Sequence, residues 1–129
     1  LVDAAGTDRM LSGLGDQPAR THMRRFGLAG FTTGCGCVAP NLCRQLLAAI
    51  KDGDDARAAE IEALFLPLED LRNGHGPITV LHAAVELAGI APTGPVIPLL
   101  TEVDAALREP IRTAAKELLE ADATATRTS

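Results

Sequence analysis

Hydrophobic and polar positions divide the chain into a first third with strand-like segments and a longer helical part. Residues 28–33 (LAGFTT) form a nearly uncharged run bounded by glycines, which is typical of a strand buried on both faces of a parallel sheet. Residues 10–16 predict the end of another short strand that runs into a glycine loop. Between them, Pro18 suits the first turn of a helix that continues to Phe26, with Gly27 as its cap. The first third therefore predicts a βαβ-like unit.

From position 40 onward, apolar residues recur at the spacing of amphipathic helices. Pro40 opens the first of four predicted helices, which ends before Gly53, and Asp54 is a candidate N-cap for the second helix. The second helix carries Pro67 within its apolar stripe, so we expect a kink or a split there.

The third predicted helix starts at Pro77 and ends at Gly89. Residues 90–103 then hold several prolines and glycines without periodicity. This composition predicts an extended segment that crosses the body of the protein.

The last predicted helix reaches about Glu120, with Pro110 in its true first turn and residues 104–109 as a separate turn or a kinked lead-in. Residues 121–129 are small and polar, and this composition predicts a frayed, disordered tail.

Composition and charge exclude several classes of protein. The 129 residues are 47% hydrophobic and 22% charged, which excludes a disordered chain and fits one globular domain. The net charge of −5 and the three aromatic residues argue against a nucleic-acid partner, because no basic stripe and few stacking groups are available. No apolar run approaches ~18 residues, so we expect no membrane span.

The start of the chain and its few strands raise a question of completeness. The sequence begins Leu1-Val2-Asp3, without an initiator methionine or a targeting segment. Two short parallel strands do not make a sheet alone, because buried parallel strands need neighbours at both edges. We therefore expect that the chain pairs with others, or that strands of the same sheet lie outside this sequence.

Three cysteines lie close together in the sequence, at Cys35, Cys37 and Cys43. An odd number does not suggest a secreted disulfide scaffold, so we expect a cytoplasmic protein. A metal site made by these residues and a distant histidine is an alternative, although no Cys-x-x-Cys pair is present. We expect instead three reduced thiols packed as small hydrophobic groups, with no metal and no cofactor.

Several stretches, taken in order, resemble one enzyme family. Residues 31–40 (FTTGCGCVAP) resemble the last strand and following helix of the dihydrodipicolinate synthase / N-acetylneuraminate lyase superfamily. Residues 11–16 (LSGLGD) resemble its seventh strand and glycine loop, and residues 52–54 (DGD) resemble a turn between its first two C-terminal helices. Residues 65–73 (FLPLEDLRN) and 94–96 (GPV) are most similar to the 5-dehydro-4-deoxyglucarate dehydratase branch.

This resemblance implies an α/β fold in which the chain is the C-terminal portion of a (β/α)8 TIM barrel. Residues 1–38 would form about the last two strands and the helix between them. Residues 39–120 would form a C-terminal region of several α-helices, and residues 121–129 the disordered tail.

The resemblance also implies a function. Members of the superfamily are lyases, aldolases or dehydratases, that form a Schiff base between a lysine and a 2-keto acid or keto-sugar acid. The lysine, a helper tyrosine and a carboxylate-binding loop lie on earlier strands in the family. We therefore expect a fragment of a homo-oligomeric lyase that has no catalytic residue of its own and no activity alone.

The candidate substrate-binding residues lie at the strand ends, because substrate meets the C-terminal ends of barrel strands. Gly13 and Thr33 are the first candidates, followed by Ser12, Thr32 and Gly34. Alternation turns only one of the two threonines inward. The alternative is that both threonines are β-branched packing residues, and the sequence leaves this open.

Other chemistry is weakly supported. Lys51 and Lys116 are expected to be solvated, whereas a Schiff-base amine must be desolvated. His22 and His75 are expected to be exposed, and no nucleophile and carboxylate stand at the spacing of a hydrolase triad. The alternative function from another class is a non-enzymatic helical protein-interaction module, which the number of amphipathic helices favours.

Overall fold

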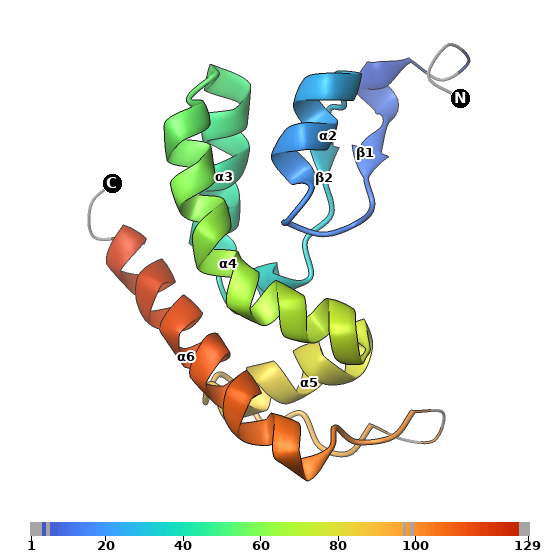
Figure 1. Cartoon of the computed structure of the whole chain (residues 1–129), viewed down its shortest axis with the longest axis vertical. Coiled ribbons are helices and arrows are strands. Elements are labelled where there is room, and N and C mark those ends of the chain that lie inside the picture. The colour runs from blue at the N-terminus through green and yellow to red at the C-terminus, as the bar shows by residue number, and fades with distance from the viewer. Residues whose placement is uncertain (1–3, 5, 97, 99, 127–129) are drawn as a thin grey trace.

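The computed structural model describes residues 4, 6–96, 98 and 100–126. A 3-10 turn at Thr7–Arg9 leads to β1 (Leu11–Ser12), α2 (Ala19–Phe26) and β2 (Gly30–Phe31), and a second 3-10 turn at Cys35–Cys37 leads to α3 (Pro40–Asp52), α4 (Asp55–His75), α5 (Pro77–Leu87) and α6 (Ala105–Thr126). The strands and α2 lie at one end of the molecule, whereas α5 and the start of α6 lie at the other (Figure 1).

The two strands are parallel, as the βαβ pattern predicts. Leu11 pairs with Gly30, and Ser12 pairs with Phe31. The expected burial of residues 28–33 on both faces is only partly right, because Gly30 is buried while Thr32 is exposed. On β1, Leu11 is 61% exposed. No further strand covers this pair among the described residues, and the ladder is only two residues long.

The predicted helix ends are confirmed at three positions. Gly27 and Gly53 adopt left-handed φ values of 64° and 83° at the C-caps of α2 and α3, a conformation that glycine adopts without a steric penalty. The Asp54 carboxylate accepts a hydrogen bond of 3.0 Å from the backbone N–H of Arg57 and caps α4.

Pro67 bends its helix without ending it. The helix α4 is continuous from Asp55 to His75, and its axis turns partway along its length (Figure 1). Pro67 donates no backbone hydrogen bond and crowds the carbonyl of Ala63, one turn earlier. Of the two alternatives predicted for Pro67, a kink is therefore observed.

The last helix differs from its prediction at both ends. It begins at Ala105, before Pro110, because Asp104 Oδ1 accepts a hydrogen bond of 2.8 Å from the backbone N–H of Ala106. It continues through the first part of the expected disordered tail to Thr126. Asp122 in this extension is buried and accepts hydrogen bonds of 2.7 Å and 2.9 Å from the Leu42 backbone N–H and Asn41 Nδ2 at the start of α3. Residues 127–129 lie outside the described part.

One hydrophobic core joins the four long helices. The helix α4 contacts α3, α5 and α6, and its buried apolar residues face all three. The large side chains at the centre of the core, all nearly inaccessible to solvent, are Leu42, Leu46, Ile61, Phe65, Leu68, Ile111 and Leu118.

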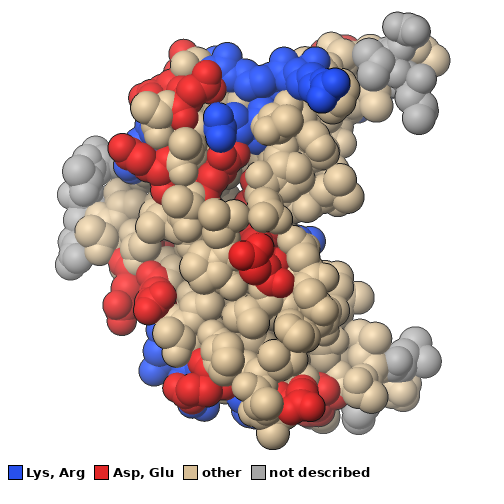
Figure 2. All heavy atoms as spheres, in the orientation of Figure 1, with Lys and Arg blue, Asp and Glu red and all other residues tan. Residues whose placement is uncertain are grey.

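The visible surface carries both signs of charge side by side (Figure 2). Arg20 on α2 pairs with Glu62 on α4 at 2.9 Å, and Arg24 pairs with Asp55 at the same distance. These pairs join the strand-bearing end to α4. Across the described residues, every helix is too short or too polar to cross a membrane.

Candidate functional site at the strand ends

The end of β1 presents one open and one packed face. Ser12 is buried, and its Oγ lies 2.8 Å from Nδ1 of His22 on α2. His22, which we expected to be exposed, is therefore half-buried and bonded. Because side chains alternate along a strand, Leu11 and Gly13 face away from α2. A Cβ added at Gly13 would meet no heavy atom within 4 Å, so the chain is open here.

The two threonines after β2 lie on different sides. Thr33 and Phe31 line a small pocket against Cys43 and Leu47 of α3. Alternation directs Thr32 toward the opposite, open side. Both threonines are exposed, so their sides differ in what they contact and not in accessibility. The Thr32 hydroxyl donates a hydrogen bond of 3.3 Å to the backbone carbonyl of Ser12. Gly13 and Thr32 thus share the open side of the strand pair.

The hydroxyl of Thr33 joins the two loops that follow the strands. It donates a hydrogen bond of 2.7 Å to Oδ2 of Asp16, in the loop after β1. It also accepts a bond of 2.9 Å from the backbone N–H of Gly36, in the 3-10 turn after β2. The hydrogen-bonding capacity of Thr33 is therefore used within the chain.

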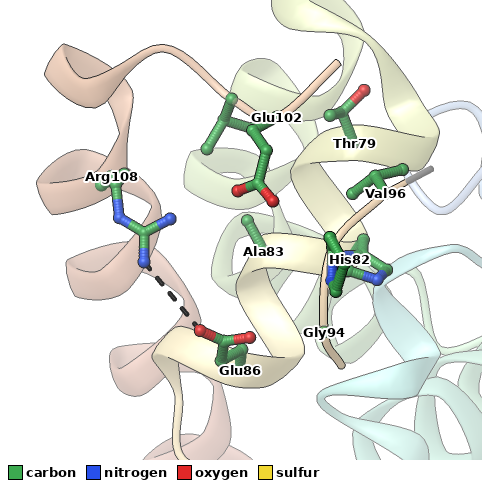
Figure 3. Close-up of a pocket in the computed structure, with 10 residues that line it drawn as sticks. Thr79, His82, Ala83, Glu86, Gly94, Val96, Glu102 and Arg108 are labelled. Carbon is green, nitrogen blue, oxygen red and sulfur yellow. Dashed lines mark ion pairs between the residues drawn. The ribbon is translucent and has the colours of Figure 1, made fainter. Parts of the chain in front are cut away.

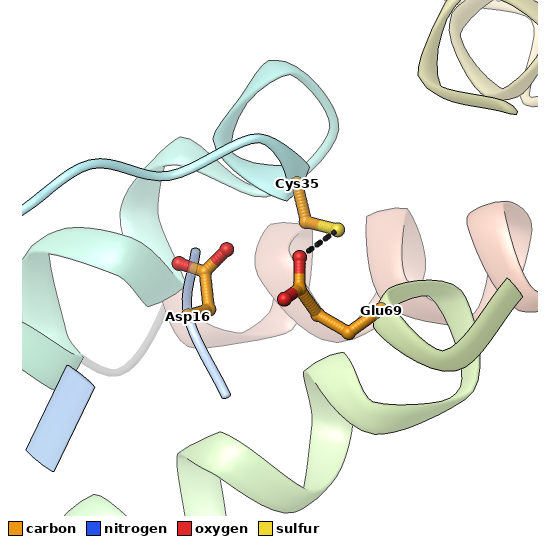
Figure 4. A group of neighbouring side chains, drawn as sticks. All are labelled: Asp16, Cys35 and Glu69. Carbon is orange, nitrogen blue, oxygen red and sulfur yellow. Dashed lines mark hydrogen bonds between the residues drawn. The ribbon is translucent and has the colours of Figure 1, made fainter. Parts of the chain in front are cut away.

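A buried polar cluster lies behind these loops. It comprises Asp16, Cys35, Cys43, Glu69 and Arg72. Asp16 and Glu69 are fully buried, and the Cys35 thiol donates a hydrogen bond of 3.1 Å to Oε1 of Glu69 (Figure 4). The Cys43 thiol donates to Oδ1 of Asp16 at 3.5 Å. Arg72 Nη1 lies 3.2 Å from both carboxylate oxygens of Glu69.

Burial controls the protonation of this cluster. Desolvation raises the pKa of Asp16, and the nearby Glu69 carboxylate raises it further, whereas the bond from Thr33 lowers it. Desolvation also raises the pKa of Cys43 to about 12 and raises the pKa of Cys35 strongly. Both thiols are therefore protonated at neutral pH and act as hydrogen-bond donors. Cys37, by contrast, is exposed.

The prediction of reduced, packed thiols is confirmed for Cys35 and Cys43, which are free and lie in the hydrophobic core, although both also donate hydrogen bonds to carboxylates. It is wrong for Cys37, which is exposed. The alternative of a site made by three cysteines and a histidine is also not seen in the described ranges, where the potential ligand atoms that lie within 4.8 Å of one another belong to Asp16, Cys35 and Glu69. A thiol is a metal ligand only as the thiolate, and the Cys35 thiol already donates to Glu69. The contacts therefore fit a hydrogen-bonded cluster better than a metal site.

A second polar region lies far from the strands, in a cavity of ≈ 280 Å³ between α5, residues 94–96 and 102–103 of the connecting segment, and α6. Four ionisable side chains surround it: His82 and Glu86 from α5, Glu102 from the connecting segment, and Arg108 from α6 (Figure 3). Arg108 Nη2 lies 4.0 Å from Oε1 of Glu86. Both partners remain well exposed, so the cavity is a solvated surface depression.

Asp16, Glu69 and Arg72 are not among the site residues that the sequence predicts. A signal for Glu69 existed, because it stands four residues after Phe65 and eight after Ile61, on the buried stripe of α4. A carboxylate at such a position requires a buried partner. Lys51 and Lys116 are exposed, as predicted.

No family model matches the chain. It is 36% identical over 92 residues to 4-hydroxy-tetrahydrodipicolinate synthase of Corynebacterium urealyticum, which covers 71% of this chain and 30% of that protein. It is 34% identical over 103 residues to the enzyme of the same name from Mycolicibacterium paratuberculosis, which covers 78% of this chain and 34% of that protein.

A third relative, the 4-hydroxy-tetrahydrodipicolinate synthase of Corynebacterium aurimucosum, is 34% identical over 99 residues, 76% of this chain and 32% of that protein. The chain therefore spans about a third of the length of the curated relatives that it matches. These similarities support the dihydrodipicolinate synthase / N-acetylneuraminate lyase superfamily. The finer resemblance to the dehydratase branch has no counterpart in these names.

Proposed function

We propose that the chain is the C-terminal part of a Schiff-base-forming lyase of the dihydrodipicolinate synthase / N-acetylneuraminate lyase superfamily. The observation that carries this proposal is the parallel strand pair, which is joined by a helix and open on one face. The chain that contains it is similar to three synthases, over about a third of the length of each. In this proposal β1 and β2 are the last two strands of a (β/α)8 barrel, and α3 to α6 form the region that covers it.

The open strand face supports this placement. Leu11 and Leu14 are large apolar residues that are exposed. Exposed apolar groups beside an unpaired strand edge favour association with further strands. In the proposed enzyme, earlier strands of the barrel cover Leu11 and complete the sheet.

The pocket wall comes from the strand ends. Gly13 and Thr32 lie on the open side, where glycine lets a substrate approach the backbone. The Thr32 hydroxyl, which donates to the Ser12 carbonyl, can accept a hydrogen bond from a substrate hydroxyl. Thr33 and Gly34 continue the wall, with Thr33 bonded to Asp16. Ser12 supports the wall through its contact with His22.

The reacting lysine belongs to the remaining part of the parent enzyme in this proposal. Its amine condenses with the keto group of a 2-keto acid or keto-sugar acid and releases water. The imine then permits aldol chemistry or dehydration, the latter as in the 5-dehydro-4-deoxyglucarate dehydratase branch. Lys51 and Lys116 are exposed, and a solvated amine is a poor nucleophile at neutral pH. The parent is proposed to be a cytoplasmic homo-oligomer.

A chimaera tests this function. The chain replaces the matching stretch of the Corynebacterium urealyticum 4-hydroxy-tetrahydrodipicolinate synthase, and the product is incubated with pyruvate and borohydride. We expect mass spectrometry to find a reduced pyruvate adduct on a lysine contributed by the synthase. A folded chimaera without an adduct, or an adduct on Lys51 or Lys116, would contradict the proposal.

A helical interaction module remains the second candidate, favoured by the continuous core that joins α3, α4, α5 and α6. The isolated chain separates the two candidates by its size in solution and its thermal melting, followed by circular dichroism. A monomer that melts cooperatively supports the module. Aggregation that is relieved by adding the N-terminal part of the synthase supports the barrel.

A further inference from the structure

We propose that Glu69 and Arg72 of α4 are positioning residues that hold the loops after both strands and thereby set the shape of the substrate pocket. This role rests on the proposed function, because only then do these loops form a pocket wall. It assigns a task to the C-terminal helical region beyond covering the barrel.

Glu69 and Arg72 form a rigid, buried unit on one turn of α4. Arg72 Nη1 lies 3.2 Å from each oxygen of Glu69, and the two side chains are 14% and 0% exposed, for Arg72 and Glu69 respectively. Three residues apart, they stand on the same face of the helix. The pair therefore moves only with α4 or at the expense of an uncompensated buried charge.

The loop after β1 lies directly against this pair. Gly15 has a φ of +91°, and a Cβ at this position would stand 2.6 Å from Arg72 Nη1 and 2.8 Å from Glu69 Oε2. Only a residue without a side chain allows the backbone to approach so closely. The next residue, Asp16, is fully buried beside the pair.

The loop after β2 contacts the same two side chains. A Cβ at Gly34 would stand 2.9 Å from Arg72 Nε and 2.7 Å from Leu81 Cδ1 of α5. The next residue, Cys35, donates its thiol hydrogen bond to Glu69 at 3.1 Å. Gly34 has a φ of −90°, so its position reflects close packing and not a strained backbone.

The two loops are also tied to each other. The hydrogen bond of 2.7 Å from Thr33 to Asp16 joins them in front of the pair. Each loop is therefore bonded to the other loop and packed closely against α4. A change in Arg72 is expected to shift both loops together, and with them the wall residues Gly13 and Thr33.

The experiment compares Arg72→Lys and Arg72→Met with Arg108→Met, a control that removes an arginine from an exposed pair on α6. Hydrogen exchange, read by mass spectrometry, is measured on the folded chimaera, in the segments that this chain contributes. We expect Arg72→Met to accelerate exchange in residues 12–16 and 32–36 before it affects α6. Arg72→Lys keeps the positive charge but loses the planar guanidinium with its several N–H donors, and we expect it to give a smaller change in the same segments.

The pyruvate-binding chimaera supplies a second measurement. Displaced wall residues weaken the binding of pyruvate more than they change the reactivity of the distant lysine. Arg72→Lys is therefore expected to raise the KM for pyruvate by ~10-fold, with a smaller change in kcat. If Arg72→Met does not fold, Gly34→Ala replaces it in the experiment. Its Cβ displaces Arg72 and Leu81 without removing a charge, and we expect the same rise in the KM for pyruvate.

The outcomes separate the two proposals. Local acceleration of exchange in both loops, together with an inactive chimaera, would support the positioning role in the fold and contradict the lyase function. An active chimaera whose KM and loop exchange are unchanged by Arg72→Lys and Gly34→Ala would contradict the positioning role. Acceleration spread evenly over α6 as well would also overturn it, since that pattern marks global unfolding.

Discussion

The buried polar cluster and the cavity between α5 and α6 each contain an arginine–glutamate pair, which is largely buried in the cluster and exposed in the cavity. In the cluster, Arg72 faces Glu69 at 3.2 Å with exposed fractions of 14% and 0%. In the cavity, Arg108 faces Glu86 at 4.0 Å with exposed fractions of 40% and 45%. The first pair joins α4 to two strand-end loops, whereas the second bridges two neighbouring helices at the surface.

This difference shows that a charged pair fixes the neighbouring backbone when it is buried, and that the presence of charge alone does not. A buried guanidinium leaves an uncompensated carboxylate when it is removed, whereas water replaces an exposed one at little cost. The cavity has more ionisable side chains in open contact with solvent, but the cluster has the contacts that fix a backbone. The strand ends are therefore the better candidate for a site that requires defined geometry.

The largest expected difference concerns the two arginines. Arg72→Met should lower the free energy of unfolding by ~3–5 kcal/mol, because it leaves Glu69 buried without its cation. Arg108→Met should change it by less than ~1 kcal/mol, since its partner is exposed. Urea unfolding of both variants measures this contrast. Equal losses in the two variants would remove the distinction between the regions.

Two glycines provide the next comparison. Gly34→Ala should cost ~1–3 kcal/mol of stability, because the new Cβ overlaps Arg72 and Leu81. Gly74→Ala, at a helical position of α4 where a Cβ meets nothing within 4 Å, should stabilise the protein by up to ~1 kcal/mol. Thermal melting of the two variants shows the signs. A neutral Gly34→Ala would mean that the loop after β2 is not closely packed.

The pH dependence of stability should show the raised pKa of Asp16. Burial raises the pKa of Asp16 in the folded state above its ordinary value of 3.8, so the folded state binds more protons than the unfolded state over the pH range between the two pKa values. The resulting stability is complete below about pH 3.8 and is lost as the pH rises through the folded pKa.

Asp16→Asn keeps an acceptor for Thr33 and should remove this loss, so that its stability falls less between acidic and neutral pH than that of the wild type. Glu102→Gln, which removes a carboxylate from the exposed cavity, is the matched control. Chemical unfolding across this pH range measures both variants. Parallel curves for Asp16→Asn and the wild type would contradict the assignment of a raised pKa to Asp16.

The smallest expected effect is a difference among thiols. Cys37 is exposed, whereas Cys35 and Cys43 are buried and donate hydrogen bonds to carboxylates. Iodoacetamide should therefore modify Cys37 first, with the other two reacting only when the cluster opens. Peptide mapping after timed alkylation gives the order. Early modification of Cys35 would indicate that the cluster is open in solution.

The local features of the fold were predictable, and the distant contacts were not. Gly27, Gly53 and Asp54 define helix ends through their own backbone and side chains, so a short window of sequence contains the signal. The backbone N–H of Leu42 at the start of α3 donates to Asp122, a residue about eighty positions away, so no short window contains this signal. The start of α6 is an exception among the local features, because the cap at Asp104 begins the helix earlier than Pro110 suggested.

The candidate site divides in the same way. The strand ends at Gly13, Thr32 and Thr33 follow from the glycine loops, whereas the sequence left open which of the two threonines lies on the open side and ranked Thr33 first. The cluster of Asp16, Cys35 and Glu69 draws on three separate segments, and only a carboxylate on the buried stripe of α4 indicated that partners were needed. A polar group that is buried by tertiary packing requires the fold before its partners can be named.

The most direct test is a crystal structure of the chimaera with the keto acid trapped on its lysine. We expect the ligand to lie at the ends of β1 and β2, in contact with Gly13 and Thr32, with the pair of Glu69 and Arg72 behind these residues. A ligand bound instead in the cavity beside Glu86 and Arg108, or strand-end loops detached from α4, would contradict it.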